Sequence, residues 1–295
     1  MEHDWGELAR QGKMSEVGRR ISKELVLEHE QRGELPTSIR FLFYELVQRG
    51  ELPKRWTHRK PGTSEANFKP DNSLSAWLMW LRERRIIPWE WIVDETRTLS
   101  NYTGWSSVKD AVESSLDKPR LDPWKGGAPL ILCESRSLAG VLDRIAVRYR
   151  VKIAATNGQV GGFLRTDIIP ALHDLNDPEI LYLGDLDIAG NDIERNDRDV
   201  LVHEGGFVDD NWTRLAINES QTKELRELGL EPVKKKDERY KGKGGMHLAW
   251  ETEALGQTSI LSIVTEALDE RLPISLEALG RREKRQASAL RKKLA

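Results

Sequence analysis

The stretch ILYLGDLDIAGND, residues 180–192, places two carboxylates, Asp185 and Asp187, directly after an apolar run. Like charges at this spacing repel each other, and removing them from water is unfavourable unless a cation or a proton lies between them. Gly190 follows and allows the backbone to turn closely beside the acids. The stretch therefore predicts a buried strand that ends in metal ligands.

The sequence around this stretch alternates between strand and helix patterns. The predicted elements are a strand at 128–134, a helix at 135–150, a strand at 151–156, a helix at 161–175 and a strand at 179–187. This alternation is typical of an α/β fold, in which helices cover a mostly parallel sheet. Ligands bind such sheets at the carboxyl ends of the strands, which is where Glu134 and Asp185 fall.

Glu134, Asp185 and Asp187 are candidate metal ligands because they end two strands that can be neighbours in the sheet. Converging carboxylates offer hard oxygen donors, which suit Mg²⁺, with Mn²⁺ as the alternative ion. The competing interpretation is that Asp185 and Asp187 only cap the helix that follows them. Matching acids at two strand ends favour the metal site.

The first part of the chain is predicted to be helical. The expected elements are helices at 14–33, 36–53 and 71–88 and a strand at 89–97. Three short helices and a strand resemble a winged helix-turn-helix, whose later helix would lie in a DNA groove. The segment 100–128, with one short helix, is read as a connection. Its Gly, Pro and Asp residues place a domain boundary near 125, between domains at 1–125 and 126–295.

Composition excludes several classes of protein. The 295-residue chain has a net charge of −2, no apolar run of 18 residues and a charged amino-terminal stretch, so neither a membrane span nor secretion is expected. The single cysteine, Cys133, excludes an internal disulfide and a cysteine-rich zinc site, and it fits the cytoplasm. The stretch from Arg281 to Lys293 carries seven basic residues against one acid and is interpreted as a solvated tail.

Glu134 at one strand end and Asp-x-Asp at a later one resemble the Toprim domain of topoisomerases, primases and some nucleases. GDLDIAG, residues 184–190, is similar to the Asp-Gly-Asp-Pro-Tyr-Gly form of the topoisomerase VI A subunit and its meiotic double-strand-break relative. The chain departs from that form at Leu186, Ile188 and Ala189, and keeps every carboxylate. The resemblance implies a winged helix-turn-helix domain followed by a Toprim domain, with Mg²⁺ on the three acids.

The same family carries a nucleophilic tyrosine before its Toprim domain, in a pattern similar to RFLFY, residues 40–44. The resemblance therefore implies Tyr44 as the nucleophile, with Arg40, one helical turn earlier, supplying positive charge to the phosphate. The alternative is that Tyr44 is a core residue with its hydroxyl at the rim. In this family the tyrosine of one subunit meets the metal site of the other, which implies a homodimer.

Two further segments match the family more loosely. Arg165 is a candidate DNA contact, although a plain turn before a helix explains its segment equally well. Glu251 and Glu253 resemble a Glu-x-Glu-Ala-Leu stretch. Approach to the metal site is one interpretation of these two acids, and helix-capping or dimer contacts are the favoured one. The chain has no ATP-binding motif, so an ATPase subunit of B type is a candidate partner. The resemblance to short stand-alone A-subunit homologues points to a bacterium, plasmid or phage and to the nucleoid.

Three functions follow as hypotheses. In the first, Tyr44 attacks double-stranded DNA and forms a 5′-phosphotyrosyl link. In the second, a Toprim nuclease of plasmid-defence type hydrolyses DNA with metal-activated water, and Tyr44 is structural. In the third, a winged-helix protein binds DNA without cleaving it.

Overall fold

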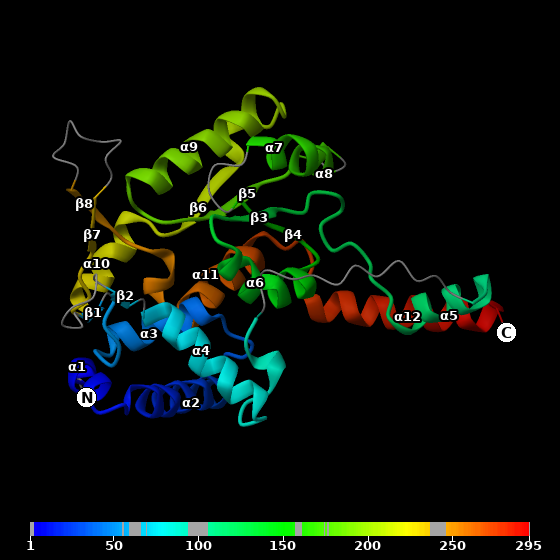
Figure 1. The fold of residues 1–295 in the computed structure, drawn as a ribbon. Helices are drawn as coiled ribbons and strands as arrows, with labels where there is room; N and C mark the ends of the chain where they lie inside the picture. Colours follow the sequence, from blue (N-terminus) through cyan, green and yellow to red (C-terminus); the bar gives the residue numbers. More distant parts are fainter. Residues whose placement is uncertain are drawn as a thin grey trace.

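The computed structural model describes residues 3–54, 56–58, 66–68, 70–93, 106–156, 161–173, 175, 177–236 and 246–294 (Figure 1). The α-helices are α1 (Trp5–Arg10), α2 (Met14–Arg32), α3 (Ile39–Gln48), α4 (Pro70–Glu83), α5 (Val108–Asp117), α6 (Arg136–Tyr149), α7 (Gly161–Phe163), α8 (Ile169–His173), α9 (Ile188–His203), α10 (Glu219–Glu227), α11 (Gln257–Arg271) and α12 (Leu276–Leu294). The strands are β1 (Trp56–His58), β2 (Ala66–Phe68), β3 (Leu130–Cys133), β4 (Lys152–Ala155), β5 (Ile180–Leu183), β6 (Trp212–Ala216), β7 (Val233–Lys236) and β8 (Met246–Ala249). Shorter helical turns are η1 (Trp89–Trp91), η2 (Leu164–Ile168), η3 (Asp209–Asn211) and η5 (Thr252–Leu255).

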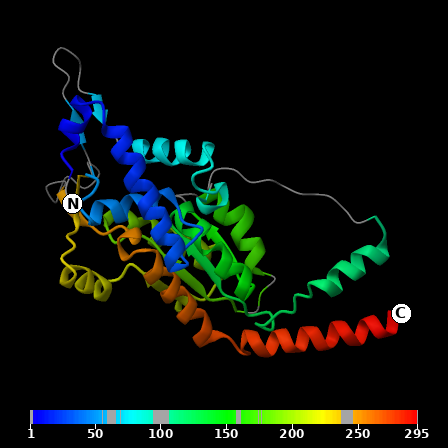
Figure 2. The same ribbon diagram turned by 90° about the horizontal axis from the view of Figure 1, so that it is seen from below.

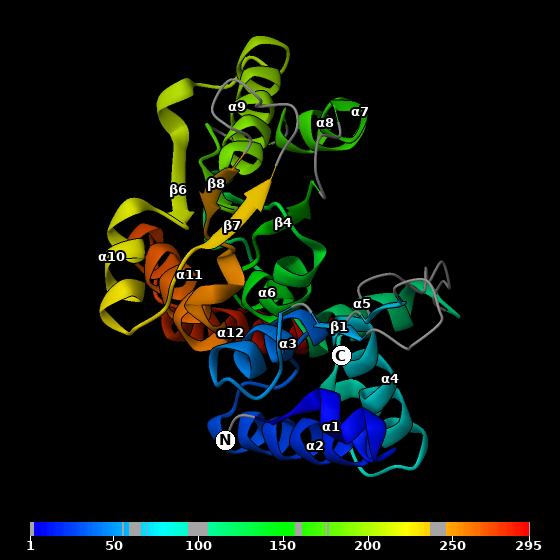
Figure 3. The same cartoon turned by 60° about the vertical axis from the view of Figure 1, so that its left-hand side comes forward.

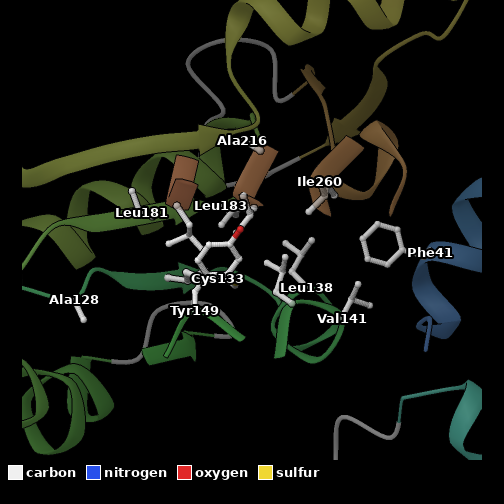
Figure 4. Packing of buried hydrophobic residues seen from close by; sticks show 14 of the residues in the cluster. Phe41, Ala128, Cys133, Leu138, Val141, Tyr149, Leu181, Leu183, Ala216 and Ile260 are labelled. Atoms are coloured by element: carbon white, nitrogen blue, oxygen red, sulfur yellow. The ribbon is translucent and has the colours of Figure 1, made fainter. Parts of the chain in front are cut away.

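A four-stranded parallel sheet in the order β4-β3-β5-β6 confirms the predicted α/β class. β3 and β5 are buried along their whole length, because successive side chains point to opposite faces and both faces are covered. Ile131 and Leu181 pack with α6 and α11 on one face, whereas Leu132 and Tyr182 pack with η2, α8 and α9 on the other. Figure 4 shows the first of these layers.

The amino-terminal helices α2, α3 and α4 form where their apolar spacing predicts them, around a core of their own. Gly33 ends α2 in the left-handed conformation at φ 73°, and the Ser38 hydroxyl caps α3 by accepting from the Phe41 N–H. The predicted strand at 89–97 is wrong over Trp89–Trp91, which form a 3₁₀ turn after Pro88; Ile92 makes one isolated bridge to Thr37. Residues 94–97 of that prediction lie outside the described residues.

Several elements of the structure were not predicted from the sequence. β1 pairs with β2 in antiparallel orientation between α3 and α4, β6 adds an edge strand to the sheet, and β7 pairs with β8 (Figure 3). The predicted solvated tail is instead part of α12, a helix of 19 residues. No helix in the described ranges is both long and apolar enough to cross a bilayer.

Helix α3 is docked onto the sheet layer, and this contact positions the candidate site. The Ser38 and Ser137 hydroxyls lie 2.9 Å apart, and the Thr37 hydroxyl donates to the Gln257 side chain at 2.6 Å. Arg144 on α6 donates to the carbonyl of Leu35 at 2.6 Å. These hydrogen bonds join the segment before α3 and its N-cap to α6 and the start of α11, and so fix how α3 docks.

Candidate functional site

Glu134 and Asp185 follow neighbouring parallel strands, and the structure brings them into direct contact. The Glu134 N–H donates to the carbonyl of Leu183 at 2.8 Å, which extends the β3–β5 pairing by one residue. The Asp185 N–H then donates to Oε2 of Glu134 at 2.9 Å. Because the two strands pair in parallel, the carboxylate of one predicted ligand, Glu134, contacts the backbone N–H of the other, Asp185.

Asp185 is fixed by a segment more distant in the sequence. Its Oδ1 accepts from the Thr252 N–H at 2.9 Å and from the Thr252 hydroxyl at 3.2 Å. Leu186 and Trp250 exchange backbone hydrogen bonds of 2.9 and 3.1 Å beside it. Arg214 donates to the Asp185 carbonyl at 2.7 Å. The carboxylate is buried and its orientation is set from two sides.

Asp187 serves as the N-cap of α9, since its Oδ1 accepts from the Gly190 N–H at 2.7 Å. The capping interpretation is thus confirmed for this residue, whereas Asp185 makes no such cap contact. A Cβ at position 190 would lie 2.3 Å from the Asp185 carbonyl oxygen, so this close approach requires glycine. A cap carboxylate and a metal ligand are compatible roles, because a carboxylate has two oxygens.

The charges of Asp185 and Asp187 both act on Glu134. The pKa of Glu134 is raised to about 7, chiefly by burial and also by the charges of Asp185 and Asp187, against the lowering by the Asp185 N–H and Arg40. Within the described ranges, no three acidic, histidine or cysteine side chains are arranged closely enough to hold a metal ion as they stand. The oxygen donor set and the mutual repulsion of the acids fit a hard cation such as Mg²⁺.

Arg40 enters this acidic cluster from α3. Its Nε lies 2.9 Å from Oε1 of Glu253, whose carboxylate is fully buried, whereas the Arg40 side chain is 40% exposed. Burial lowers the pKa of Arg40, but the charges of Glu253, Asp185, Glu251 and Glu134 outweigh it and raise the pKa overall. Arg40 is therefore the cation that faces the predicted ligands within the same chain.

Tyr44 lies one turn beyond Arg40 and is flanked by two cations. The Lys54 ammonium is 4.8 Å and the Arg40 guanidinium 5.9 Å from the centre of the Tyr44 ring. Lys54 also lies 3.3 Å from Oε2 of Glu251, and burial raises the pKa of Glu251 to about 7. Each cation beside the tyrosine thus pairs with a glutamate of the segment that holds Asp185.

We name residues 251–253 the clasp, because they contact the ligand side and the tyrosine side of the site together. Thr252 holds Asp185, Glu253 holds Arg40 and Glu251 holds Lys54. Glu251 occupies the N-cap position of η5, and the charge of Asp185 acts on Glu253, so these glutamates lie close to the predicted ligands. Contacts between subunits stay a prediction. No local sequence pattern marks the pairings with Arg40 and Lys54, because they depend on how distant parts of the chain pack.

The Arg40–Glu253 pair should be energetically coupled. We expect Arg40→Gln to lower the free energy of unfolding by about 2 kcal/mol, since it leaves a buried carboxylate without its countercharge. The same substitution should have at least about 1 kcal/mol less effect in a Glu253→Gln background. Urea unfolding of the four proteins in EDTA measures the cycle. Equal effects of Arg40→Gln in both backgrounds would show that the pair is not coupled.

Asp197 on α9 is a buried acid that the sequence reading missed. It is 0% exposed, and no hydrogen bond of normal geometry reaches either carboxylate oxygen in the part of the chain that the structure describes. Burial raises its pKa to about 7, the nearby Thr156 hydroxyl lowers it in part, and the charges of Glu134 and Glu194 raise it. It lies at helical spacing from the buried Ile193, Val200 and Leu201, so an acid on the apolar face of the helix was the available sequence signal.

Asp197 should make stability dependent on pH. Because its pKa is higher in the folded than in the unfolded protein, its favourable contribution is complete below about pH 4 and is lost as the pH rises through 7. We expect the stability of Asp197→Asn, relative to wild type, to rise by about 2 kcal/mol between pH 5 and pH 8. Urea unfolding in EDTA at both pH values measures this, with the exposed Asp199→Asn on the same helix as the control. If the stability difference between Asp197→Asn and wild type did not change with pH, the raised pKa of Asp197 would be contradicted.

The other residues considered from the sequence lie elsewhere. Arg165 pairs with Glu204 on the surface of the sheet layer. Tyr149 and Tyr182 are buried in the two core layers, and Tyr102 and Tyr240 lie outside the described residues.

Comparisons with known proteins add no relative. No family model, no curated protein and no solved structure matches this chain. Function has to be argued from the site itself.

Proposed function

We propose that the chain cleaves double-stranded DNA, with Tyr44 as nucleophile and Glu134, Asp185 and Asp187 as the residues that hold Mg²⁺. The supporting observation is that the clasp contacts both halves of this arrangement within one chain. It binds Asp185 through Thr252, and through its two glutamates it pairs with the cations that flank Tyr44.

In this proposal the Tyr44 oxygen bonds to a backbone phosphorus atom, and the bond to the 3′-oxygen of the preceding nucleotide breaks. The product is a 5′-phosphotyrosyl link and a 3′-hydroxyl, which takes up a proton. Arg40 and Lys54, which flank the ring, balance the charge that grows on the phosphate oxygens. Bound Mg²⁺ would supply a Lewis acid that orients the phosphate.

The domain types, the oligomeric state, the partner and the location in the cell belong to the same proposal. The amino-terminal helices would be a winged helix-turn-helix domain and the sheet layer a Toprim domain, as in the A subunit of topoisomerase VI. One such site cuts one strand, so a homodimer would be required to break both. An ATPase of B type would be the partner if the break serves strand passage, and the nucleoid would be the place of action.

A Toprim nuclease is the second candidate. Tyr44 is only partly exposed, packs on the amino-terminal core and contacts the Phe43 ring edge-on at 5.5 Å. A tyrosine held in this way has a sufficient structural role, and water would then be the nucleophile at the acids.

One experiment separates the candidates. The protein is incubated with end-labelled duplex and Mg²⁺ or Mn²⁺, denatured, and analysed for cleaved DNA and for DNA covalently bound to protein. The proposal expects both products. Cleavage without an adduct supports the nuclease, and binding without cleavage under either metal supports a non-catalytic DNA-binding protein.

A further inference from the structure

Helix α12 and the shorter α5 lie together and project away from the sheet layer (Figures 1 and 2). One face of α12 packs against the rest of the protein, because Leu279, Glu283 and Ala287, at helical spacing, are buried. The Glu283 carboxylate lies 2.5 Å from Arg150 and accepts from the Leu121 N–H at 2.8 Å. This face fixes the direction of the helix.

The opposite face of α12 is basic. Arg281 is paired with Glu277 one turn earlier, and Arg291 is paired with Asp117 of α5. The five other basic residues are exposed and have no ion-pair partner among the described residues: Arg282, Lys284, Arg285, Lys292 and Lys293. With 3.6 residues per turn, these five lie away from the buried stripe.

Five cations without countercharges within about 17 Å of helix repel one another, so the fold gains nothing from this arrangement. A double-stranded nucleic acid presents about one phosphate charge per 1.7 Å of its axis, a density that several of these side chains can meet at once. An anionic membrane is the less suitable partner. An amphipathic helix binds a bilayer through its apolar face, and that face of α12 is buried against the protein.

The position of this surface separates it from the acids. Leu121 and Arg150, which hold Glu283, precede β3 and β4 in the chain and so lie at the amino ends of the parallel strands. Glu134 and Asp185 lie at the carboxyl ends. The basic face of α12 therefore starts from the amino ends of the strands, whereas the candidate cleavage site lies at their carboxyl ends.

We propose that the basic face of α12 is a second nucleic-acid surface, which binds the phosphate backbone independently of base sequence. This goes beyond the proposed cleavage activity, since it requires neither a metal nor Tyr44. In this proposal α12 binds the DNA backbone at a point distant from the phosphate that reacts. The sequence alone had indicated only a solvated tail.

The test compares unpaired with paired arginines on the same helix. Fluorescence anisotropy measures the affinity of the full chain for a labelled duplex of mixed sequence, in EDTA, from 50 to 300 mM salt. We expect Arg282→Gln/Arg285→Gln to weaken binding about tenfold at 100 mM salt and to reduce the slope of log K against log salt by about 2. The matched control, Arg281→Gln/Arg291→Gln, should change the slope by less than half as much, because those charges are already neutralised.

Three results would overturn the proposal. These are equal slopes for the two double variants, an unchanged slope for the unpaired variant, and tighter binding of wild type to phosphatidylserine vesicles than to DNA. Circular dichroism melts verify that both variants fold, as expected for exposed positions. Because the assay contains no metal, its outcome is independent of cleavage, and a failure of Tyr44 to form an adduct leaves this surface intact.

Discussion

Replacing Asp185 with alanine should reduce metal-dependent DNA cleavage at least about 100-fold. Asp185 contacts two other parts of the site, because its N–H donates to Glu134 and its carboxylate accepts from Thr252. The substitution removes one ligand and leaves the two Thr252 donors without their acceptor. Initial cleavage rates of labelled duplex in Mg²⁺ measure the effect, with the exposed Asp210→Ala as the matched control.

Asp185→Asn separates charge from shape in the same assay. The amide oxygen keeps an acceptor for Thr252, so the local structure should persist while the negative charge is lost. We expect Asn to be nearly as inactive as Ala. Full activity of the Asn variant would show that Asp185 is structural, and full activity of the Ala variant would refute the site.

The site should also respond to pH through Glu134. Its pKa is raised to about 7, and a carboxyl must lose its proton before it can hold a metal ion. At fixed, subsaturating Mg²⁺, cleavage should therefore rise up to about tenfold per pH unit below 7 and level off above it. Saturating Mg²⁺ should move this transition to lower pH, because the ion competes with the proton.

Tyr44→Phe should abolish the covalent DNA adduct, because only the hydroxyl can form the bond to phosphorus. The ring and its contacts with Lys54, Arg40 and Phe43 persist in phenylalanine, so the fold and DNA affinity should change little. Denaturing gel analysis of protein-bound label gives the result. The buried Tyr149→Phe serves as the control for loss of a tyrosine hydroxyl elsewhere, and unchanged cleavage in Tyr44→Phe would favour the nuclease.

Mixing the two inactive proteins determines which subunit supplies the tyrosine. In a mixed dimer of Tyr44→Phe and Asp185→Ala chains, a tyrosine that acts on the partner's acids restores one site and nicks one strand. A tyrosine that acts on its own chain's acids restores none. The resemblance implies recovery, because it places the tyrosine of one subunit at the acids of the other. The pairing of Arg40 and Lys54 with the clasp of the same chain favours no recovery, and the mixture decides between the two arrangements.

The sheet and its acidic edge could be predicted because short-range patterns determine them. Buried parallel strands are continuous apolar runs, so ILYL and LILC were recognisable. The sequence allowed β3 and β5 to be neighbours, and the structure confirms that they pair. Strand pairing then fixes Glu134 beside Asp185 without further information. The same reasoning failed for Trp89–Trp91, where aromatic residues with high strand propensity form a 3₁₀ turn after Pro88.

The clasp could not be predicted because its contacts depend on how distant parts of the chain pack. Glu253 meets Arg40 only once α3 docks on α6 and the start of α11. Neither residue carries a local pattern that encodes this docking. Likewise, α12 has helical spacing of its buried residues, but its density of charge is equally typical of a solvated tail.

The dependence of Asp185 on Thr252 also has a consequence during synthesis. Tyr44, Glu134, Asp185 and Asp187 leave the ribosome well before residues 250–253, so the nascent chain holds every proposed reacting group without the contact that orients its central acid. A chain that stops before Trp250 lacks that contact permanently. Early termination or proteolysis at this point would therefore yield a protein that retains the whole motif yet lacks the hydrogen bonds that orient the Asp185 carboxylate.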